Sequence, residues 1–289
     1  MKPAPFDYVA PMSIDAACAA LTDAGGGATV LAGGQTLVPL LNLRLSQPFV
    51  IVDINRIEAL KGITRVDGGI RVGPMTRQCE ALTHELLVRE LPALVQAVRH
   101  VGHHQTRTRG TIGGSIALGE PAAELPATAV ALDAQIEVRS SRGTRRIAAV
   151  DFYLGPYLTA LEPDELVTGI VFPEWPQGHR VLFREVAQRP GDFALLGLVG
   201  ALSLERGRIV RAGLAWFGMG PTPIRAQAAE RLLVDLAPDA VDAEAVAELA
   251  LTGTAPFDDH HASAEYRRTV GRRLCAQLLR DALAMRVAA

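Results

Sequence analysis

Two pairs of adjacent glycines lie where the chain could hold an anionic ligand. The first, Gly33-Gly34, follows the apolar segment Ala28–Leu31 and precedes a helical pattern that begins at Leu37. Paired glycines permit positive φ angles and close approach of a ligand to the backbone, while successive N–H groups before a helix attract negative charge. The segment matches neither GxGxxG nor GxxxxGKS/T, and the chain contains no Gly-Lys pair, so a nucleoside-triphosphate site is disfavoured. The turn suits a pyrophosphate, although by itself an ordinary strand-to-helix turn is the simpler interpretation.

The second pair, Gly113-Gly114, comes about 80 residues later and is flanked by the hydroxyl side chains of Thr111 and Ser115. Two such loops can hold one extended ligand from two sides, with the hydroxyl groups donating to its phosphate or ribitol oxygens. The occurrence of two pairs is therefore more informative than either pair alone.

Two carboxylates, Glu120 and Glu124, follow closely after the second glycine pair. A carboxylate so near a bound cofactor can accept hydrogen bonds from ribose or flavin-ring donors. Two other interpretations stay open. The two residues could form a pair of catalytic acids, or they could be acids at the N-terminus of a helix, where the helix dipole favours negative charge.

A polar hairpin is the last segment with candidate chemistry. The stretch 183–194 carries aromatic, basic and acidic side chains around Pro190-Gly191, between two segments with strand-like sequence. By itself this pattern predicts a β-hairpin and no particular activity.

Alternating helical and strand-like segments predict the framework that positions these groups. Ser13 can cap a first helix, which the glycines at 25–27 would end, and the apolar stripe over 91–101 stops at Gly102. The glycine-rich, polar stretch 103–124 then predicts a binding loop. The elements predicted in this first part are helices at 13–22, 37–45 and 91–101 and strands at 28–31, 49–54 and 69–72.

The second half predicts an antiparallel sheet backed by helices. Pro173, Pro176 and Gly178 mark the best domain boundary. The last predicted helix covers 263–287 and carries one apolar stripe, made of Tyr266, Val270, Leu274 and Leu278. A helix at 125–134 and strands at 135–139, 166–172, 181–187, 195–204 and 209–217 complete the prediction.

Length and composition describe a two-domain globular chain. The 289 residues exceed one ordinary domain of roughly 150 residues. The 29 basic and 31 acidic residues give a net charge of −2 without a block of like charge, which argues against nucleic acid and anionic membrane surfaces as partners. No apolar run approaches the roughly 20 residues of a membrane span, and the N-terminus lacks the apolar core of a signal peptide, so we expect a soluble, cytoplasmic protein.

No metal site is predicted. The three cysteines lie far apart and are interpreted as reduced, buried, small apolar side chains, too few for a protein-only Cys₄ iron–sulfur cluster. His100, His103 and His104 could suggest a metal cluster, but Gly102 interrupts the helix and no suitably spaced acid or cysteine accompanies them.

Taken together and in order, these segments resemble the medium, FAD-binding subunit of the bacterial molybdenum hydroxylases, the family of carbon monoxide dehydrogenase and xanthine dehydrogenase. Any one segment is weak evidence, whereas the ordered set, which runs over nearly the whole chain, is specific. The segments that carry the resemblance are Ala32-Gly33-Gly34-Gln35-Thr36-Leu37-Val38-Pro39, Arg107-Thr108-Arg109-Gly110-Thr111-Ile112-Gly113-Gly114, Pro121-Ala122-Ala123-Glu124-Leu125-Pro126, Leu161-Glu162-Pro163-Asp164-Glu165-Leu166, Arg189-Pro190-Gly191-Asp192-Phe193-Ala194 and Ser263-Ala264-Glu265-Tyr266-Arg267-Arg268.

The resemblance implies an α+β fold with an FAD-binding domain of the vanillyl-alcohol-oxidase (PCMH) type over 1–176, made of subdomains at about 1–56 and 57–176. A C-terminal sheet-and-helix domain of the CO dehydrogenase flavoprotein type follows over 177–289. Carried over residue by residue, the resemblance implies a cofactor site and no catalytic residue for the organic substrate. The implied FAD contacts are Ala32, Gly33, Gly34, Gln35, Thr36 and Leu37 in the first loop, Thr111, Ile112, Gly113, Gly114 and Ser115 in the second, and Val101, Glu124, Leu166, Arg184 and Asp192 around the flavin.

The resemblance further implies a multi-subunit complex. In such complexes a large molybdopterin subunit hydroxylates the substrate with oxygen derived from water. A small subunit relays electrons through two iron–sulfur clusters of the 2Fe–2S type, and the FAD of the medium subunit delivers them to an external acceptor. The implied assembly is a heterotrimer that doubles into a dimer of heterotrimers, with molybdopterin and iron–sulfur clusters only in the partner subunits. This chain would position and tune the FAD, mainly through backbone N–H groups of both glycine loops.

The sequence departs from the family pattern around the implied flavin. Many relatives have Asp-Pro-Gln-Val-Arg-Asn where this chain has His-His-Gln-Thr-Arg-Thr at 103–108, and His-Ala-Asp is common where it has Leu118-Gly119-Glu120. FAD binding is still expected, while the reduction potential, the acceptor and the substrate stay open. Two alternatives remain: a self-contained FAD oxidase of the same fold, disfavoured by the short C-terminal region, and a scaffold protein without cofactor, disfavoured by the two intact glycine pairs.

Overall fold

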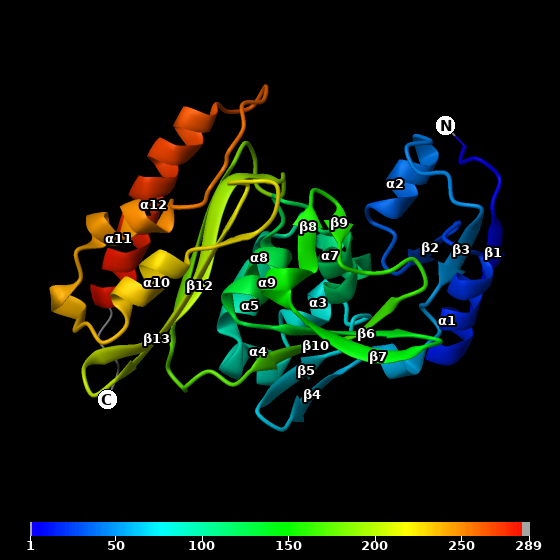
Figure 1. Cartoon of the computed structure of the whole chain (residues 1–289), viewed down its shortest axis with the longest axis horizontal. Helices are drawn as coiled ribbons and strands as arrows, with labels where there is room; N and C mark the ends of the chain where they lie inside the picture. The colour runs from blue at the N-terminus through cyan, green and yellow to red at the C-terminus, as the bar shows by residue number, and fades with distance from the viewer. Residues whose placement is uncertain (1, 285–289) are drawn as a thin grey trace.

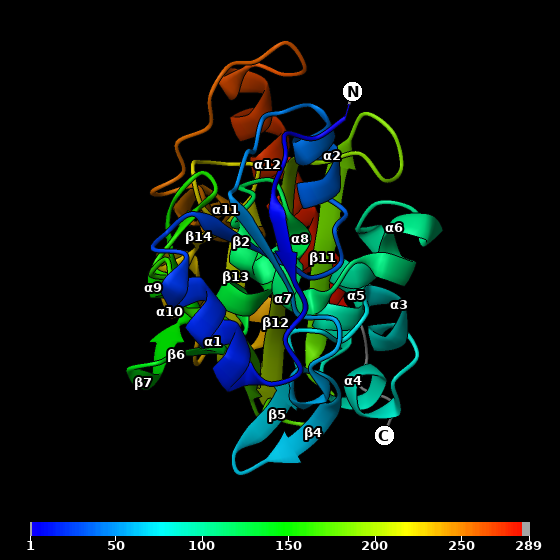
Figure 2. The same cartoon turned by 90° about the vertical axis from the view of Figure 1, so that its right-hand side faces the viewer.

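The computed structural model describes residues 2–284, whose mixed helices and strands form successive layers (Figure 1). The first layer is a small parallel sheet with α1 (Ile14–Asp23) beside it, and this layer is nearest the viewer in Figure 2. Ser13 begins α1 as predicted, because its Oγ accepts the N–H of Ala16 at 3.2 Å, and the helix ends before Gly25, which has a φ of +55°. The strands, in spatial order, are β1 (Asp7–Val9), β3 (Val50–Asp53) and β2 (Ala28–Leu31), and α2 (Leu37–Asn42) and the 3₁₀ helix Glu58–Leu60 complete this layer.

A five-stranded antiparallel sheet forms the second layer. Its strands, in spatial order, are β4 (Ile63–Val66), β5 (Gly69–Val72), β10 (Leu166–Pro173), β6 (Gln135–Ser140) and β7 (Gly143–Ala148). The strand that comes last along the chain, β10, lies at the centre and joins the hairpins β4–β5 and β6–β7 into one sheet. Helices and a short hairpin connect these strands: α3 (Gln78–Ala81), α4 (Glu85–Glu90), α5 (Pro92–His100), α6 (His104–Arg109), α7 (Ile112–Leu118), α8 (Glu124–Ala131), α9 (Ala149–Phe152), β8 (Tyr153–Gly155) and β9 (Leu158–Thr159).

A four-stranded antiparallel sheet forms the third layer and is covered on both faces. Figure 1 shows α8 on one side of it and α11 and α12 on the other. Along the central strand, Val199 and Ala201 pack toward α5 and α8, whereas Leu198 and Leu202 pack toward the C-terminal helices. Burial on both faces explains why this strand is almost continuously apolar. The elements are β11 (Arg180–Ala187), β12 (Ala194–Glu205), β13 (Arg208–Phe217), β14 (Ile224–Arg225), α10 (Gln227–Leu233), the 3₁₀ helix Pro238–Ala240, α11 (Ala243–Ala250) and α12 (Ala264–Ala284).

A glycine lets α8 pack directly on the third layer. A Cβ at Gly213 of β13 would lie only 2.1 Å from the carbonyl oxygen of Ala131, the last residue of α8. No larger side chain fits there without moving one of the two backbones. This close approach merges the core around α8 with one face of the C-terminal sheet.

The structure confirms the predicted antiparallel sheet backed by helices. It corrects the prediction of a binding loop over 103–124. That stretch is not one loop, because it contains α6 and α7. Strands β1, β4, β7, β8, β9 and β14 were not predicted. The last helix is confirmed over Ala264–Ala284, whereas 285–287 lie outside the described residues. In its stripe Leu274 and Leu278 are buried, but Tyr266 is 44% exposed.

Two further features bear on the composition-based expectations. Over residues 2–284, no helix has both the length and the apolar character needed to cross a bilayer. All three cysteines are free thiols; Cys18 and Cys275 are buried as expected, while Cys79 is only partly buried. Burial raises the pKa of the Cys275 thiol to about 12, so this thiol stays protonated.

Candidate functional site

The first glycine pair forms an open turn between β2 and α2. Gly34 has a φ of +72°, and a Cβ at Gly33 would lie 2.4 Å from the carbonyl oxygen of Arg109, so the turn touches the second loop directly. Within the described part of the chain, the backbone N–H groups of 33–37 have no hydrogen-bond acceptor. Five successive donors are therefore free for a strongly accepting ligand.

The second glycine pair is used for close packing. A Cβ at Gly113 would lie 2.3 Å from the Cβ of Pro74, and the Gly113 N–H donates to the Pro74 carbonyl at 2.8 Å. The Gly114 N–H donates to Thr111 Oγ1 at 3.0 Å, which caps α7. The prediction that N–H groups of both loops serve a ligand is therefore wrong for Gly113 and Gly114, whose donors are already used.

Two hydroxyl groups of the second loop keep a free proton. Thr111 Oγ1 accepts the N–H of Gly114, and Ser115 Oγ accepts Nε2 of Gln78 at 3.0 Å. Because a hydroxyl group can accept and donate at once, both remain able to donate. Thr111 is buried, whereas Ser115 is partly exposed.

Two side chains that the sequence did not single out join the loops. Asn55 Nδ2 donates to the Ala32 carbonyl at 2.8 Å, and Asn55 Oδ1 accepts Arg77 Nη2 at 2.6 Å. Arg77 Nη1 also donates to the carbonyl oxygen of Arg109, and burial, followed by the charge of Arg109, lowers the pKa of Arg77. Asn55 follows the carboxyl end of parallel strand β3, a place where α/β sheets collect ligand-binding groups, and that signal could have found it. No spacing in the sequence points to Arg77.

A buried acidic cluster brings Glu124, at the start of α8, near Glu185 of β11 and Glu120. Glu124 begins α8 and is 5% exposed, and burial, with a smaller contribution from Glu185 and Glu120, raises its pKa to about 8. Burial likewise raises the pKa of Glu185, although His100 opposes the shift through its Nδ1, 3.1 Å from Glu185 Oε1. A carboxyl group such as Glu124 is mainly protonated at neutral pH and can donate a hydrogen bond.

The titration of Glu124 yields a stability prediction. Its folded-state pKa lies above the ordinary value of 4.5, so the native state binds the extra proton and loses stability as pH rises from 4.5 to about 8. We expect Glu124→Gln to remove this loss, which is on the order of 4 kcal/mol. Urea midpoints of both proteins at pH 5 and pH 8.5 would measure it. Parallel pH dependence in the two proteins would contradict the assignment.

Two of the remaining FAD contacts implied by the resemblance, Arg184 and Leu166, lie away from the acidic cluster. Arg184 turns away from Glu124, with its Nη2 3.4 Å from Asp281 Oδ2 of α12. Since side chains alternate along a strand, its neighbour Glu185 faces α5 instead. Leu166, 3% exposed, lies in the core of the first layer, so the structure brings neither Leu166 nor Arg184 together with the acidic cluster.

Val101 and Asp192 lie on two segments that touch each other. Val101 ends α5, and its carbonyl accepts Arg107 Nη1 at 2.9 Å. Asp192 lies in the β11–β12 turn, where a Cβ at the preceding Gly191 would lie 2.5 Å from His103 Cε1. The unusual His103 is thus in contact with the hairpin turn. Among the described residues, no group of three or more histidine, cysteine or acidic side chains is arranged to hold a metal.

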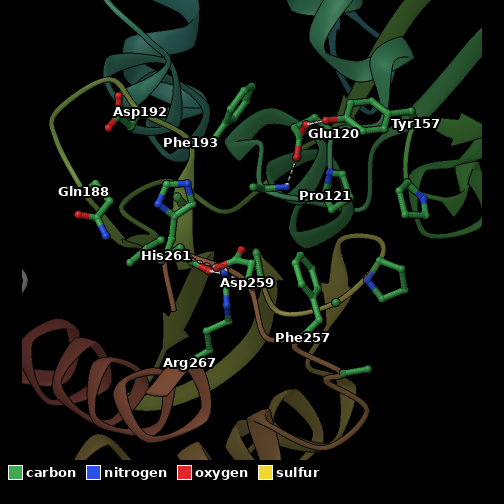
Figure 3. Close-up of a pocket in the computed structure, with 18 of the residues that line it drawn as sticks. Glu120, Pro121, Tyr157, Gln188, Asp192, Phe193, Phe257, Asp259, His261 and Arg267 are labelled. Atoms are coloured by element: carbon green, nitrogen blue, oxygen red, sulfur yellow. Dashed lines mark hydrogen bonds and ion pairs between the residues drawn. The ribbon is translucent and has the colours of Figure 1, made fainter. Parts of the chain in front are cut away.

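A pocket of about 980 Å³ opens beside the hairpin turn (Figure 3). Its wall combines the segment after α7, the β8–β9 turn, the β11–β12 turn and the segment between α11 and α12. The side chains labelled in Figure 3 are Glu120, Pro121, Tyr157, Gln188, Asp192, Phe193, Phe257, Asp259, His261 and Arg267.

Two protein families match adjoining parts of the chain. The family described as the FAD binding domain in molybdopterin dehydrogenase matches residues 4–175, and the CO dehydrogenase flavoprotein C-terminal domain matches residues 181–282. The 6-hydroxypseudooxynicotine dehydrogenase complex subunit alpha of Paenarthrobacter nicotinovorans is 39% identical over 284 residues, which cover 98% of this chain and 96% of that protein. The carbon monoxide dehydrogenase medium chain of Afipia carboxidovorans is 36% identical over 267 residues, which cover 92% and 93%.

Solved structures agree with these matches. A chain of the reconstituted CO dehydrogenase from Oligotropha carboxidovorans superimposes with a TM-score of 0.95 at 34% identity, covering 98% of this chain and 99% of that one. A chain of quinoline 2-oxidoreductase from Pseudomonas putida 86 gives a TM-score of 0.91 at 33% identity, covering 98% of both. The likeness extends over all three layers of the fold.

Proposed function

Because this chain belongs to the family of FAD-binding medium subunits of the molybdenum hydroxylases, we propose that it is the electron-transferring flavoprotein subunit of a heterotrimeric enzyme. Electrons would enter from iron–sulfur clusters of a small partner subunit and leave to an external acceptor. Oxidation of the organic substrate would take place in a large molybdopterin subunit, and the trimer would double into a dimer of heterotrimers. We place the complex in the cytoplasm, and the domains at 1–176 and 177–289.

The first glycine loop is the observation that carries this proposal. Five free N–H donors at 33–37 stand against the second loop, and negative pyrophosphate oxygens are the acceptors such a row favours. Ser115 and Thr111 would donate to the ribitol or phosphate oxygens. The Asn55–Arg77 bridge would hold the two loops at a fixed separation.

The bound FAD would supply the redox chemistry, and this chain would supply position and electrostatics. Val101, Glu124 and Asp192 are proposed to surround the flavin ring. With a pKa of about 8, Glu124 would donate a hydrogen bond at neutral pH, whereas the sequence suggested an accepting carboxylate. Glu185 replaces Arg184 as the β11 side chain that faces this region.

Purification of the tagged chain from its own host would test the proposal. We expect a yellow complex with about one non-covalent FAD per chain, bleached by dithionite, and two co-purifying subunits that carry molybdenum and iron. A colourless complex that refuses added FAD would overturn the flavoprotein assignment. Bleaching of the isolated chain by an organic substrate would instead favour the self-contained oxidase.

A further inference from the structure

The pocket of Figure 3 is bordered by three exposed aromatic rings from distant segments. Tyr157 follows β8, Phe193 lies in the β11–β12 turn and Phe257 precedes α12, and they are 61%, 61% and 54% exposed. Only Asp192 belongs both to this pocket and to the proposed FAD contacts. Exposed rings around a hollow of this size are suited to stacking on a planar ligand.

One ring is held in place by its backbone and its hydroxyl group. Tyr157 has a φ of +56°, a left-handed conformation that is unusual for a residue with a side chain, and its N–H donates to Gly119 at 3.1 Å. Its hydroxyl group donates to Glu120, whose other oxygen accepts the Ala122 N–H at 3.0 Å. The ring is thus fixed at the pocket wall before any ligand arrives.

The charges around the pocket disfavour an anionic ligand. Glu120, Asp192 and Asp259 contribute three carboxyl groups. Burial acts to raise the pKa of Asp259, but backbone N–H groups and the charge of Arg267 bring it below its ordinary value, so this group is ionised. Arg267, the only arginine or lysine of the lining, is 3% exposed.

The positive charge of Arg267 is already committed to the protein. Its Nη2 lies 2.6 Å from Asp259 Oδ2, and its Nη1 donates to the carbonyl oxygens of Leu195 and, at 3.2 Å, Gly218. It therefore ties α12 to the ends of β12 and β13 rather than reaching into the pocket. A pyrophosphate would meet acids here without a free cation.

We propose that this pocket binds the electron acceptor, and that the acceptor is a planar, uncharged aromatic molecule of the quinone class rather than a pyridine nucleotide. The inference rests on the proposed function, since it needs reduced FAD nearby as the electron donor. Reduction of a quinone to its hydroquinone takes up two electrons and two protons, the number that fully reduced flavin gives up on returning to its oxidised form. The three rings would stack on the quinone while the neighbouring carboxylates repel phosphate groups.

Binding to the complete oxidised complex tests the class of ligand without relying on turnover. We expect a water-soluble para-naphthoquinone to bind, measured by calorimetry, and the same ring carrying a sulfonate to bind about fivefold or more weakly because of the carboxylates. NAD⁺ at equal concentration should neither bind nor displace the quinone. Equal affinity for both rings, or displacement by NAD⁺, would overturn the proposal.

Substitution of one ring tests the site. Phe257→Ala should weaken naphthoquinone binding about tenfold, and Phe257→Trp should retain it, because stacking needs a ring and not a particular residue. Phe49→Ala, which removes a ring 78% exposed on the first layer, is the matched control and should bind like the parent. When the dithionite-reduced complex is mixed anaerobically with naphthoquinone, flavin reoxidation should be slowest in Phe257→Ala. The parent, Phe257→Trp and Phe49→Ala should reoxidise at similar rates.

The outcomes separate this inference from the function on which it rests. A complex without FAD would contradict the proposed function itself. A complex with FAD that binds no naphthoquinone, or that binds it equally well after Phe257→Ala, would leave the flavoprotein assignment intact and exclude this pocket as a quinone site.

Discussion

Replacing Gly33 by alanine is expected to weaken FAD binding by the assembled complex about ten- to a hundredfold, because overpacking a fitted contact costs about 1–3 kcal/mol. The new Cβ would lie 2.4 Å from the carbonyl oxygen of Arg109 and 2.9 Å from the Cα of Gly110. Both neighbours are backbone atoms, so the two loops must separate. FAD content per purified complex and the affinity of the cofactor-free complex for added FAD would measure the effect.

Gly155→Ala is the matched control for Gly33→Ala. Its added Cβ would meet only Leu158 side-chain atoms at 3.8 and 3.9 Å, which is ordinary van der Waals contact. We expect normal FAD content and unchanged thermal unfolding in this variant. If Gly33→Ala retained FAD with parental affinity, the contact between the two loops would not be part of the cofactor site.

Local patterns were sufficient for most of the framework. The serine and glycine at the ends of α1 act as a cap and a stop, and the hairpin around Pro190-Gly191 connects β11 and β12 as predicted. These features depend on residues adjacent in sequence, which is why the sequence reveals them. The nearly continuous apolar sequence of β12 agrees with the burial of both of its faces in the structure.

The stretch 103–124 shows where local patterns fail. Gly113 and Gly114 favour a loop by intrinsic propensity, yet they lie inside α7. The helix forms because Gly113 must pack on Pro74, where any larger side chain would collide, and because Thr111 caps it. The contact with Pro74 is invisible along the chain, so the tertiary environment overrides propensity here, whereas the Thr111 cap is a local contact.

The sequence predicted which loop has free N–H donors, but it did not predict which side chains hold that loop. The first loop has the free donors expected of it, whereas Asn55 reaches it from the end of β3 and Arg77 from the segment before α3, and no spacing connects them in sequence. Arg184 and Glu185 show a second limit. A shift of one residue along a strand exchanges its faces, so a contact carried over by resemblance can fall on the neighbouring position.

Replacing Trp216 by alanine is expected to destabilise the chain by about 3–5 kcal/mol, the usual cost of removing a fully buried tryptophan. Trp216 is fully buried on the face of β13 that packs against the C-terminal helices, and its Nε1 donates to the Ala250 carbonyl at 2.7 Å. The substitution leaves a cavity and an unpaired buried carbonyl group. Urea unfolding of the chain would show the loss as a lower midpoint.

The position of Trp216 also predicts that Trp216→Ala should leave FAD binding intact. Its neighbours Ala215 and Phe217 face α8 and the core of the second layer, whereas Trp216 faces α10, α11 and α12. The variant should therefore loosen the C-terminal helices while the glycine loops keep their contact, so that below its unfolding midpoint the complex retains FAD. Trp216→Phe, which keeps a ring but loses the hydrogen bond, should cost less than the alanine variant. An unfolding midpoint unchanged by Trp216→Ala would mean that the C-terminal layer does not contribute to the cooperative stability of the chain. Loss of FAD without a change in the midpoint would mean that Trp216 affects FAD binding directly and not through stability.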